Sequence, residues 1–472
     1  MSKIEVNAIE PQCGTDLTVG ASGDTITFPT GTTIVNNGTQ TGFGRTGTVD
    51  WQTSIKTTSF TAVSGEGYFV NTTSGAITMT LPASPSVGDI VSVKDYAQTF
   101  NTNNLTVGRN SEPIEGETFD LLLDTLGVAI TLIYGDATKG WQSVNSNEVI
   151  NQQLFVAASG GTETTSGDFK IHTFTGPGTF TVSCAGNPSG SNSVSYMVVA
   201  GGGGGGGTNP QPSGGPYSSG GGGGGGGYRE GKTSTDCYTA SPLNAPEGVP
   251  VTATAYPITV GGGGAGGPGS GIGVAGSNSV FSTITSAGGG FGTHRGATSP
   301  AGSGGSGGGG SGNTCNPSGS VAGSGNTPPV SPPQGSSGGN GSPPNYPAFG
   351  ANAGGGGGAT AVGVAADSSE GGDGGAGATS SINGTPTARS GGGGGGVYTC
   401  GSKGLCGSGA GGTGGAGPGG PAAGSTSPGN GQAGTTNTGG GGGGGSTVGP
   451  DGTKREGGTG GSGIVIIRYR FQ

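Results

Sequence analysis

The sequence predicts an all-β protein, and three observations lead to that fold class. Aliphatic and aromatic residues make up 28% of the chain and charged residues only 9%, which is low for a globular enzyme. Glycine contributes 121 of the 472 residues, and glycine weakens the interior of an α-helix. The apolar residues occur in short runs that alternate or are rich in β-branched residues, with Gly, Pro and Asn between the runs. The chain should therefore consist of strands, turns and extended segments.

Glycine content changes abruptly near Ala200, because only 24 of the 121 glycines lie in residues 1–200. This change and the strand pattern divide the chain into four predicted parts. They are a segment of short strands at 1–48, a β-sandwich or jelly roll at 49–148, a linker at 149–167 and a glycine-rich domain at 168–472.

The sandwich is predicted because strand signals recur with turns between them. Four segments carry the pattern: Tyr68–Val70, Ile77–Leu81, Asp89–Val93 and Ile130–Tyr134. Trp51 and Trp141 bracket this region, and we expect both to be core or seam residues.

A second β unit is expected to begin at Asp168, with strands in residues 168–200. Three strands are few for a stable sheet, so the apolar segment 463–471 should supply a partner, with further strands at 256–260 and 279–285. The glycine-rich region would then be an insertion between strands of one sheet.

The glycine-rich region could be a disordered linker or an ordered bundle of polyproline II-like helices. Its long runs recur, each followed by a segment of different composition, which favours order: Gly201–Gly207, Gly221–Gly227, Gly261–Gly264, Gly354–Gly358, Gly391–Gly396 and Gly439–Gly445. Helices of this kind have no internal hydrogen bonds, so side-by-side packing must pair their backbone groups, and only glycine permits that approach. A run of seven residues would span about 22 Å.

Charge and cysteine content argue against several classes of site. The net charge of −9 is spread along the chain without a Lys/Arg cluster, so nucleic acid is not an expected partner. The six cysteines form no CxxC pair, and we expect no metal and no cofactor. Cys400 and Cys406 are close enough in sequence to form a disulfide around residues 401–405 in an oxidising medium, and two free thiols are an equal alternative.

Four landmarks in the glycine-rich half resemble the glycine-rich domains of phage tail fibres and adhesins. They are Val194–Ala200 running into seven glycines, Tyr256–Gly261, Gly276–Phe281 and Gly460–Tyr469. The opening residues 1–7 and 14–20 are similar to the fibre N-termini of marine phages. The resemblance implies a polyglycine II sandwich whose variable loops touch a bacterial surface receptor, on a fibre exposed on the virion. The segments 228–255 and 314–349 are long for such loops, which leaves the end of the bundle that each occupies open.

On this reading the protein is a structural, receptor-binding protein with no catalytic residues, and its receptor is a host surface glycan or outer-membrane protein. Aromatic and cationic side chains contribute most binding per residue at such surfaces. Those in the loops are the candidate receptor contacts: Tyr238, His294, Arg295, Tyr346, Phe349, Tyr398 and Lys403. The alternative interpretation is that these side chains pack against the glycine block of their own chain and do not contact a receptor.

Two other functions remain open, a glycan depolymerase and a purely architectural tail or capsid fibre. Glycan cleavage uses paired carboxylates, and the local acidic cluster contains Glu112, Glu115, Glu117 and Asp120. Such a cluster is more typical of a solvated loop. Short strands at the N-terminus cannot bury both faces alone, so we expect residues 1 to about 150 to form a homotrimer, with residues 1–48 attached to a tail or capsid protein.

Overall fold

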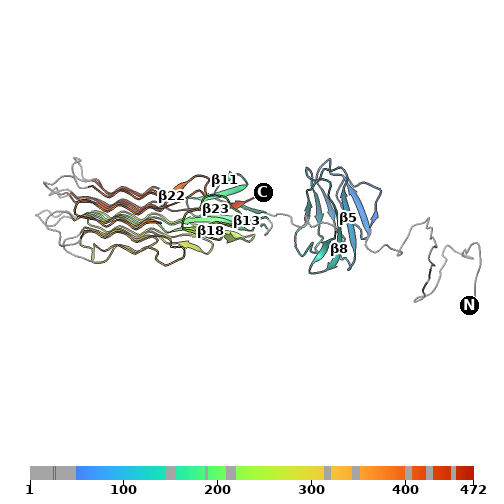
Figure 1. Cartoon of the computed structure of the whole chain (residues 1–472), viewed down its shortest axis with the longest axis horizontal. Helices are drawn as coiled ribbons and strands as arrows, with labels where there is room; N and C mark the ends of the chain where they lie inside the picture. The colour runs from blue at the N-terminus through green and yellow to red at the C-terminus, as the bar shows by residue number, and fades with distance from the viewer. Residues whose placement is uncertain are drawn as a thin grey trace, which may run out of the picture. The chain divides into compact units, whose positions relative to one another are not determined.

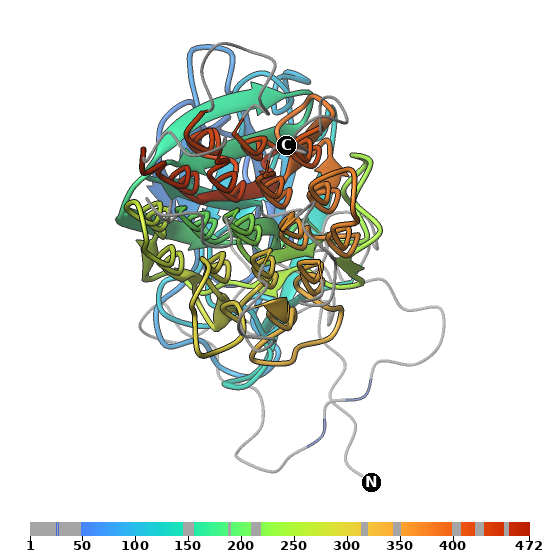
Figure 2. The ribbon, with the colours of Figure 1, turned by 90° about the vertical axis from the view of Figure 1, so that its left-hand side faces the viewer.

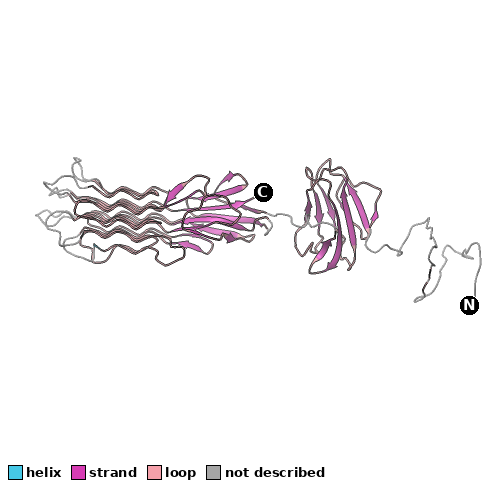
Figure 3. Ribbon diagram, in the orientation of Figure 1, coloured by secondary structure: helices cyan, strands magenta, loops and turns pink. Residues whose placement is uncertain are grey.

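The computed structural model describes residues 25, 27, 49–144, 155–186, 190–208, 219–312, 320–342, 351–398, 407–420, 429–447 and 453–472. The chain divides into two compact units, residues 1–150 and 151–472. The described residues form strands, turns and extended segments, in agreement with the all-β prediction (Figure 3). Apart from residues 25 and 27, the predicted N-terminal segment 1–48 lies outside this description. Nowhere in the described ranges is there a helix long and apolar enough to cross a bilayer.

Unit 1 is a sandwich of two sheets. The first sheet is ordered β1 (Asp50–Trp51), β3 (Glu66–Val70), β5 (Ile90–Asp95), β8 (Ala129–Asp136) and β9 (Gly140–Ser143). The second is ordered β2 (Phe60–Thr61), β4 (Ile77–Thr80), β6 (Leu105–Gly108) and β7 (Leu121–Leu123). From β1 to β6 the chain alternates between the sheets, so β1, β3 and β5 pair in parallel, as do β2, β4 and β6. A jelly roll would be antiparallel, so the sandwich alternative is the one that holds.

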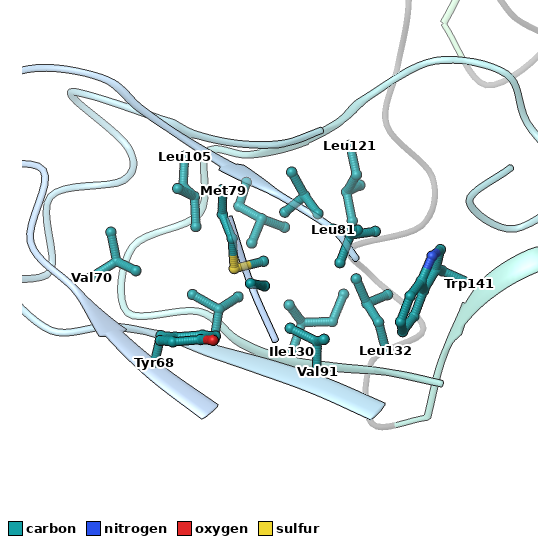
Figure 4. Packing of buried hydrophobic residues seen from close by; sticks show 14 of the residues in the cluster. Tyr68, Val70, Met79, Leu81, Val91, Leu105, Leu121, Ile130, Leu132 and Trp141 are labelled. Atoms are coloured by element: carbon teal, nitrogen blue, oxygen red, sulfur yellow. The ribbon is translucent and has the colours of Figure 1, made fainter. Parts of the chain in front are cut away.

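The core of unit 1 follows from the alternation in its strands. In β4, Ile77 and Met79 are buried while Thr78 and Thr80 are half-buried, as a strand with one face on a core requires. Figure 4 shows side chains from both sheets, including Met79 and Trp141, meeting in this core. Trp51 departs from the expectation: it is 42% exposed and its ring lies 4.9 Å from that of Phe69.

Unit 2 contains two larger sheets where the sequence led us to expect one. The first is ordered β10 (Val156–Ser159), β13 (Gly178–Ala185), β18 (Ala255–Thr259), β19 (Ser279–Phe281) and β20 (Ile284–Ser286). The second is ordered β11 (Thr162–Ser166), β12 (Phe169–Phe174), β23 (Ile464–Arg470), β14 (Ser193–Val199), β15 (Tyr228–Gly231) and β16 (Asn244–Ala245). β17 (Val249–Pro250) also pairs with β14, and β21 (Ala378–Ser380) forms a hairpin with β22 (Thr387–Arg389).

The expected role of the last strand is confirmed, because β23 pairs antiparallel with both β12 and β14. The linker expected at 149–167 is wrong in part, since β10 and β11 lie within it and pair with β13 and β12. Side chains from both sheets, such as Phe180 and Tyr469, form the core between them. A second cluster, which includes Met197 and Ile466, covers the other face of the second sheet.

Several polar side chains are buried at these sheets, among them His172 and the pair Arg468 and Asp236. His172 lies between them: its Nδ1 is 2.7 Å from the Gly160 carbonyl oxygen and its Nε2 is 3.1 Å from the Tyr469 hydroxyl. Burial lowers the pKa of His172 below its usual range. On the other face of the second sheet, the buried Arg468 donates from Nε to the buried Asp236 carboxylate at 3.0 Å.

The glycine-rich region forms a block of extended passes that begin where the strands end (Figure 1). Seen end-on, the passes are three-sided coils lying side by side (Figure 2). In the pass 201–207, the N–H groups of Gly202, Gly203 and Gly204 donate to three different passes, at Gly461, Gly224 and Val274. The next three N–H groups return to the same three passes, at Gly458, Gly221 and Gly271. This period of three, with partners only in neighbouring passes, is that of polyglycine II.

Steric contact explains why the inner passes are pure glycine. A Cβ on Gly203 would lie 2.6 Å from the carbonyl carbon of Gly290 and 2.9 Å from the oxygen of Gly289, and backbone atoms cannot rotate away. In the outer pass 261–267, a Cβ on Gly262 would meet nothing within 4 Å. Side chains are therefore tolerated where a pass faces solvent, and Ala265 occupies such an exposed position.

Candidate functional site

The glycine passes reverse direction at two ends, one beside the sheets and one remote from them. Because the pass 201–207 leaves β14 and the pass 220–227 leads into β15, Thr208 and Ser219 lie at the remote end. Hydrogen bonds and bridges join the residues at this level into what we call the distal layer: Thr208, Ser219, Thr293, Ser311, Gly312, Ala351, Asn352, Tyr398, Ser446, Thr447 and Arg455.

Small polar side chains complete the backbone hydrogen bonding of the distal layer. Asn352 accepts from the Tyr398 N–H at 3.1 Å and donates to the Asp367 carbonyl oxygen at 3.0 Å. Thr208 Oγ1 accepts from the Arg455 N–H at 3.0 Å, and Ser446 Oγ accepts from the Val397 N–H at 2.9 Å. At Thr208, Asn352 and Ser446, a buried polar side chain thus completes the hydrogen bonding at the end of a glycine pass.

His294 and Arg295 follow directly on the distal layer, since Thr293 bonds to Gly309 and Ser311. They lie in a turn closed by the bond from the Ala297 N–H to the His294 carbonyl oxygen, at 3.2 Å. Both side chains are partly exposed. Burial lowers the pKa of His294, so its imidazole is neutral at pH 7 and Arg295 supplies the charge of this turn.

Tyr398 belongs to the distal layer itself. It bridges Thr447, and its side chain is partly exposed. Five other residues singled out in the sequence lie outside the described residues: Tyr346, Phe349, Lys403 and the two cysteines of the possible disulfide, Cys400 and Cys406. Two of the described residues that flank them are Ser342 and Gly407. Ser342 donates to the carbonyl oxygen of Asn352 in the distal layer, and Gly407 forms a β-bridge with Glu370.

Tyr238 is not at the distal layer. It is 7% exposed and packs in the cluster on the second sheet, with the Arg468 guanidinium 5.6 Å and the Lys232 ammonium 5.4 Å from its ring centroid. Desolvation raises the pKa of its hydroxyl. A side chain so buried offers no contact surface, and Tyr238 is therefore a core residue.

The acidic cluster of unit 1 has structural partners. Glu112 accepts from the Tyr134 hydroxyl at 2.8 Å, Glu115 from the Ser143 N–H at 2.6 Å, and Asp120 from the Arg109 N–H at 2.8 Å. The first two bonds fasten the loop to β8 and β9. Within the described ranges, no group of three or more His, Cys, Asp or Glu side chains is arranged to hold a metal ion.

The anchoring residues of the distal layer were missed in the sequence, although a signal is present. Gly207 is followed by Thr208, Ser219 precedes Gly220, and Gly445 is followed by Ser446. A small hydrogen-bonding residue at the end of a glycine run supplies the partners that the last backbone groups of a pass lack, much as a capping residue does for an α-helix.

Comparison with known proteins agrees with this architecture. A search of curated proteins found no match to the chain. A family model described as a glycine-rich domain matches residues 174–470, from β12 to β23 and across the whole glycine block. The chain therefore belongs to the glycine-rich domain family.

Proposed function

We propose that this chain is a structural protein of a virus particle, a phage tail fibre or adhesin that binds a bacterial surface through the segments carried by the distal layer. One observation carries the proposal: the described residues at the ends of several glycine passes are joined by hydrogen bonds in the distal layer, while the strands lie at the opposite end of the block. Binding residues are commonly placed on loops held by a rigid scaffold. The resemblance of the four landmarks to fibre domains supports the same reading.

The proposed contacts are His294, Arg295 and Tyr398, together with Tyr346, Phe349 and Lys403 from the adjoining segments. Their partner is a host surface glycan or outer-membrane protein. Tyrosine and arginine side chains are enriched among binding hot spots. Tyr238 is left out because it is buried.

A competition assay tests this function. Purified full-length protein, added before phage, should block adsorption of the phage to its host. Replacing Tyr398 or Arg295 with Ala should raise the protein concentration needed for blocking about tenfold, the effect of losing about 1.4 kcal/mol. Tyr96→Ala, which alters an exposed tyrosine of unit 1, is the matched control and should block like the wild type.

Other outcomes point to the competing functions. Absence of blocking by the wild-type protein would contradict receptor binding and indicate an architectural fibre. Shortened chains after incubation with host polysaccharide would indicate a depolymerase. The proposed assembly is a homotrimer held through residues 1–150 and attached to the virion at the N-terminus, and sedimentation of the full chain as a monomer would contradict it.

A further inference from the structure

A pocket of about 530 Å³ opens in unit 2 at the start of β14, the end of that strand remote from the glycine passes. Its volume lies within the range of small-molecule sites. Three separate segments of the chain form its wall, around residues 190–193, 233–235 and 246–250. The pocket is therefore distinct from the distal layer and from the function proposed for it.

The walls of this pocket are held in place by buried contacts. Thr233 donates from its N–H to Ser195 Oγ at 3.1 Å, and Ser195 Oγ donates to the Asp236 carboxylate at 2.9 Å. Gly248 lies close against β14, since a Cβ there would be 2.5 Å from both Thr233 Cγ2 and the Val194 carbonyl oxygen. A wall fixed in this way loses little conformational entropy when a ligand binds.

Three of the polar side chains that line the pocket are available for a ligand. Among the described residues, no hydrogen-bond partner within the chain is found for the side chains of Asn192, Ser193 or Glu247. An amide and a hydroxyl both donate and accept, and a carboxylate accepts. The lining residues are Gly, Ser, Asn, Thr, Pro and Glu, so the wall has neither a cation for an anionic ligand nor an aromatic ring.

We propose that this pocket binds a neutral saccharide of one or two sugar rings. Sugar hydroxyls match a wall that offers both donors and acceptors, and the rings of Pro246 and Pro250 supply apolar surface for the C–H groups of a sugar. Glu247 gives the pocket its selectivity, because its carboxylate accepts from a sugar hydroxyl and repels the carboxylate of an acidic sugar.

Ligand-observed NMR on the full-length chain tests the site with three probes: methyl β-glucoside, N-acetylglucosamine and glucuronate. At least one neutral sugar should bind, and glucuronate should bind at least about tenfold more weakly. Glu247→Gln should weaken neutral-sugar binding about tenfold and reduce the discrimination against glucuronate, because a charged acceptor is lost. Asn192→Ala should weaken binding of the neutral sugar as well.

The matched control is Glu456→Gln, which removes an exposed carboxylate beside the distal layer and should leave binding unchanged. Absence of binding by both neutral sugars would overturn the inference, as would binding that neither Glu247→Gln nor Asn192→Ala weakens. Binding lost in Tyr398→Ala but kept in both pocket variants would move the sugar to the distal layer. That result would reject the pocket while supporting the proposed function.

Discussion

Two glycine-to-alanine substitutions in the block should have opposite effects on stability. At Gly203 the added methyl group would meet the backbone of residues 289 and 290, and no side-chain rotation relieves the overlap. Moving the pass 201–207 would also weaken the bonds from the Gly203 N–H to Gly224 and from the Gly442 N–H to Gly203, both near 2.9 Å. Overpacking of about 1–3 kcal/mol and two lost hydrogen bonds of about 1 kcal/mol each predict a loss of about 3–5 kcal/mol.

Gly262→Ala is the control, because its methyl group meets nothing and residue 262 has no positive φ. Restricting the unfolded chain should raise the free energy of unfolding by about 0.4–1 kcal/mol. Circular dichroism during denaturant unfolding measures both variants. The two tryptophans, Trp51 and Trp141, lie in unit 1, so tryptophan fluorescence should report an unchanged transition there. Equal stability of the two variants would refute the packing argument for inner glycines.

Two further predictions concern the buried polar groups of unit 2. The pKa of His172 is lower in the folded than in the unfolded chain, so the unfolded chain binds more protons as pH falls below about 6.5 and stability declines there. The wild type should lose up to about 1.4 kcal/mol more per pH unit than His172→Gln between pH 6.5 and 5, and parallel pH profiles in denaturant unfolding would contradict this. Asp236→Asn leaves the Arg468 charge buried without a counter-ion and should cost about 3–5 kcal/mol, whereas Asp236→Leu with Arg468→Met should recover most of that loss in thermal unfolding. A double variant no more stable than Asp236→Asn would argue against this account.

The glycine block and the last strand could be predicted because their signals are local. A run of glycines such as 201–207 can pack densely as polyglycine II helices lying side by side. The apolar strand β23 needed a partner strand to cover it. β11 escaped detection because Thr162–Ser166 has no apolar residue, and β10 because Val156 is its only large apolar residue. They are edge strands of their sheets, so they need little buried surface and leave little pattern in the sequence.

The remaining features could not be predicted because they depend on contacts between segments that are distant in the sequence. Tyr238 lies among Cys, Thr, Ala and Ser in the sequence, which is typical of an exposed loop, yet Arg468 and Ile382 from elsewhere in the chain help to bury it. The pocket at β14 requires residues from three segments, none of which has a binding motif of its own. In unit 1, the alternation of apolar and polar residues along each strand predicts a buried and an exposed face. It does not predict that β1, β3 and β5 pair in parallel.

The direction of the hydrogen bonds in the glycine block determines how unit 2 carries mechanical force. The bonds join neighbouring passes and so run across the pass axis. Tension applied at the distal layer would enter β14 through the pass 201–207 and β23 through residues 453–463, and these two strands are paired with each other. Such a load shears many bonds at once, whereas a sideways pull on an outer pass opens them in succession. Unit 2 should therefore resist stretching along its passes much better than peeling across them.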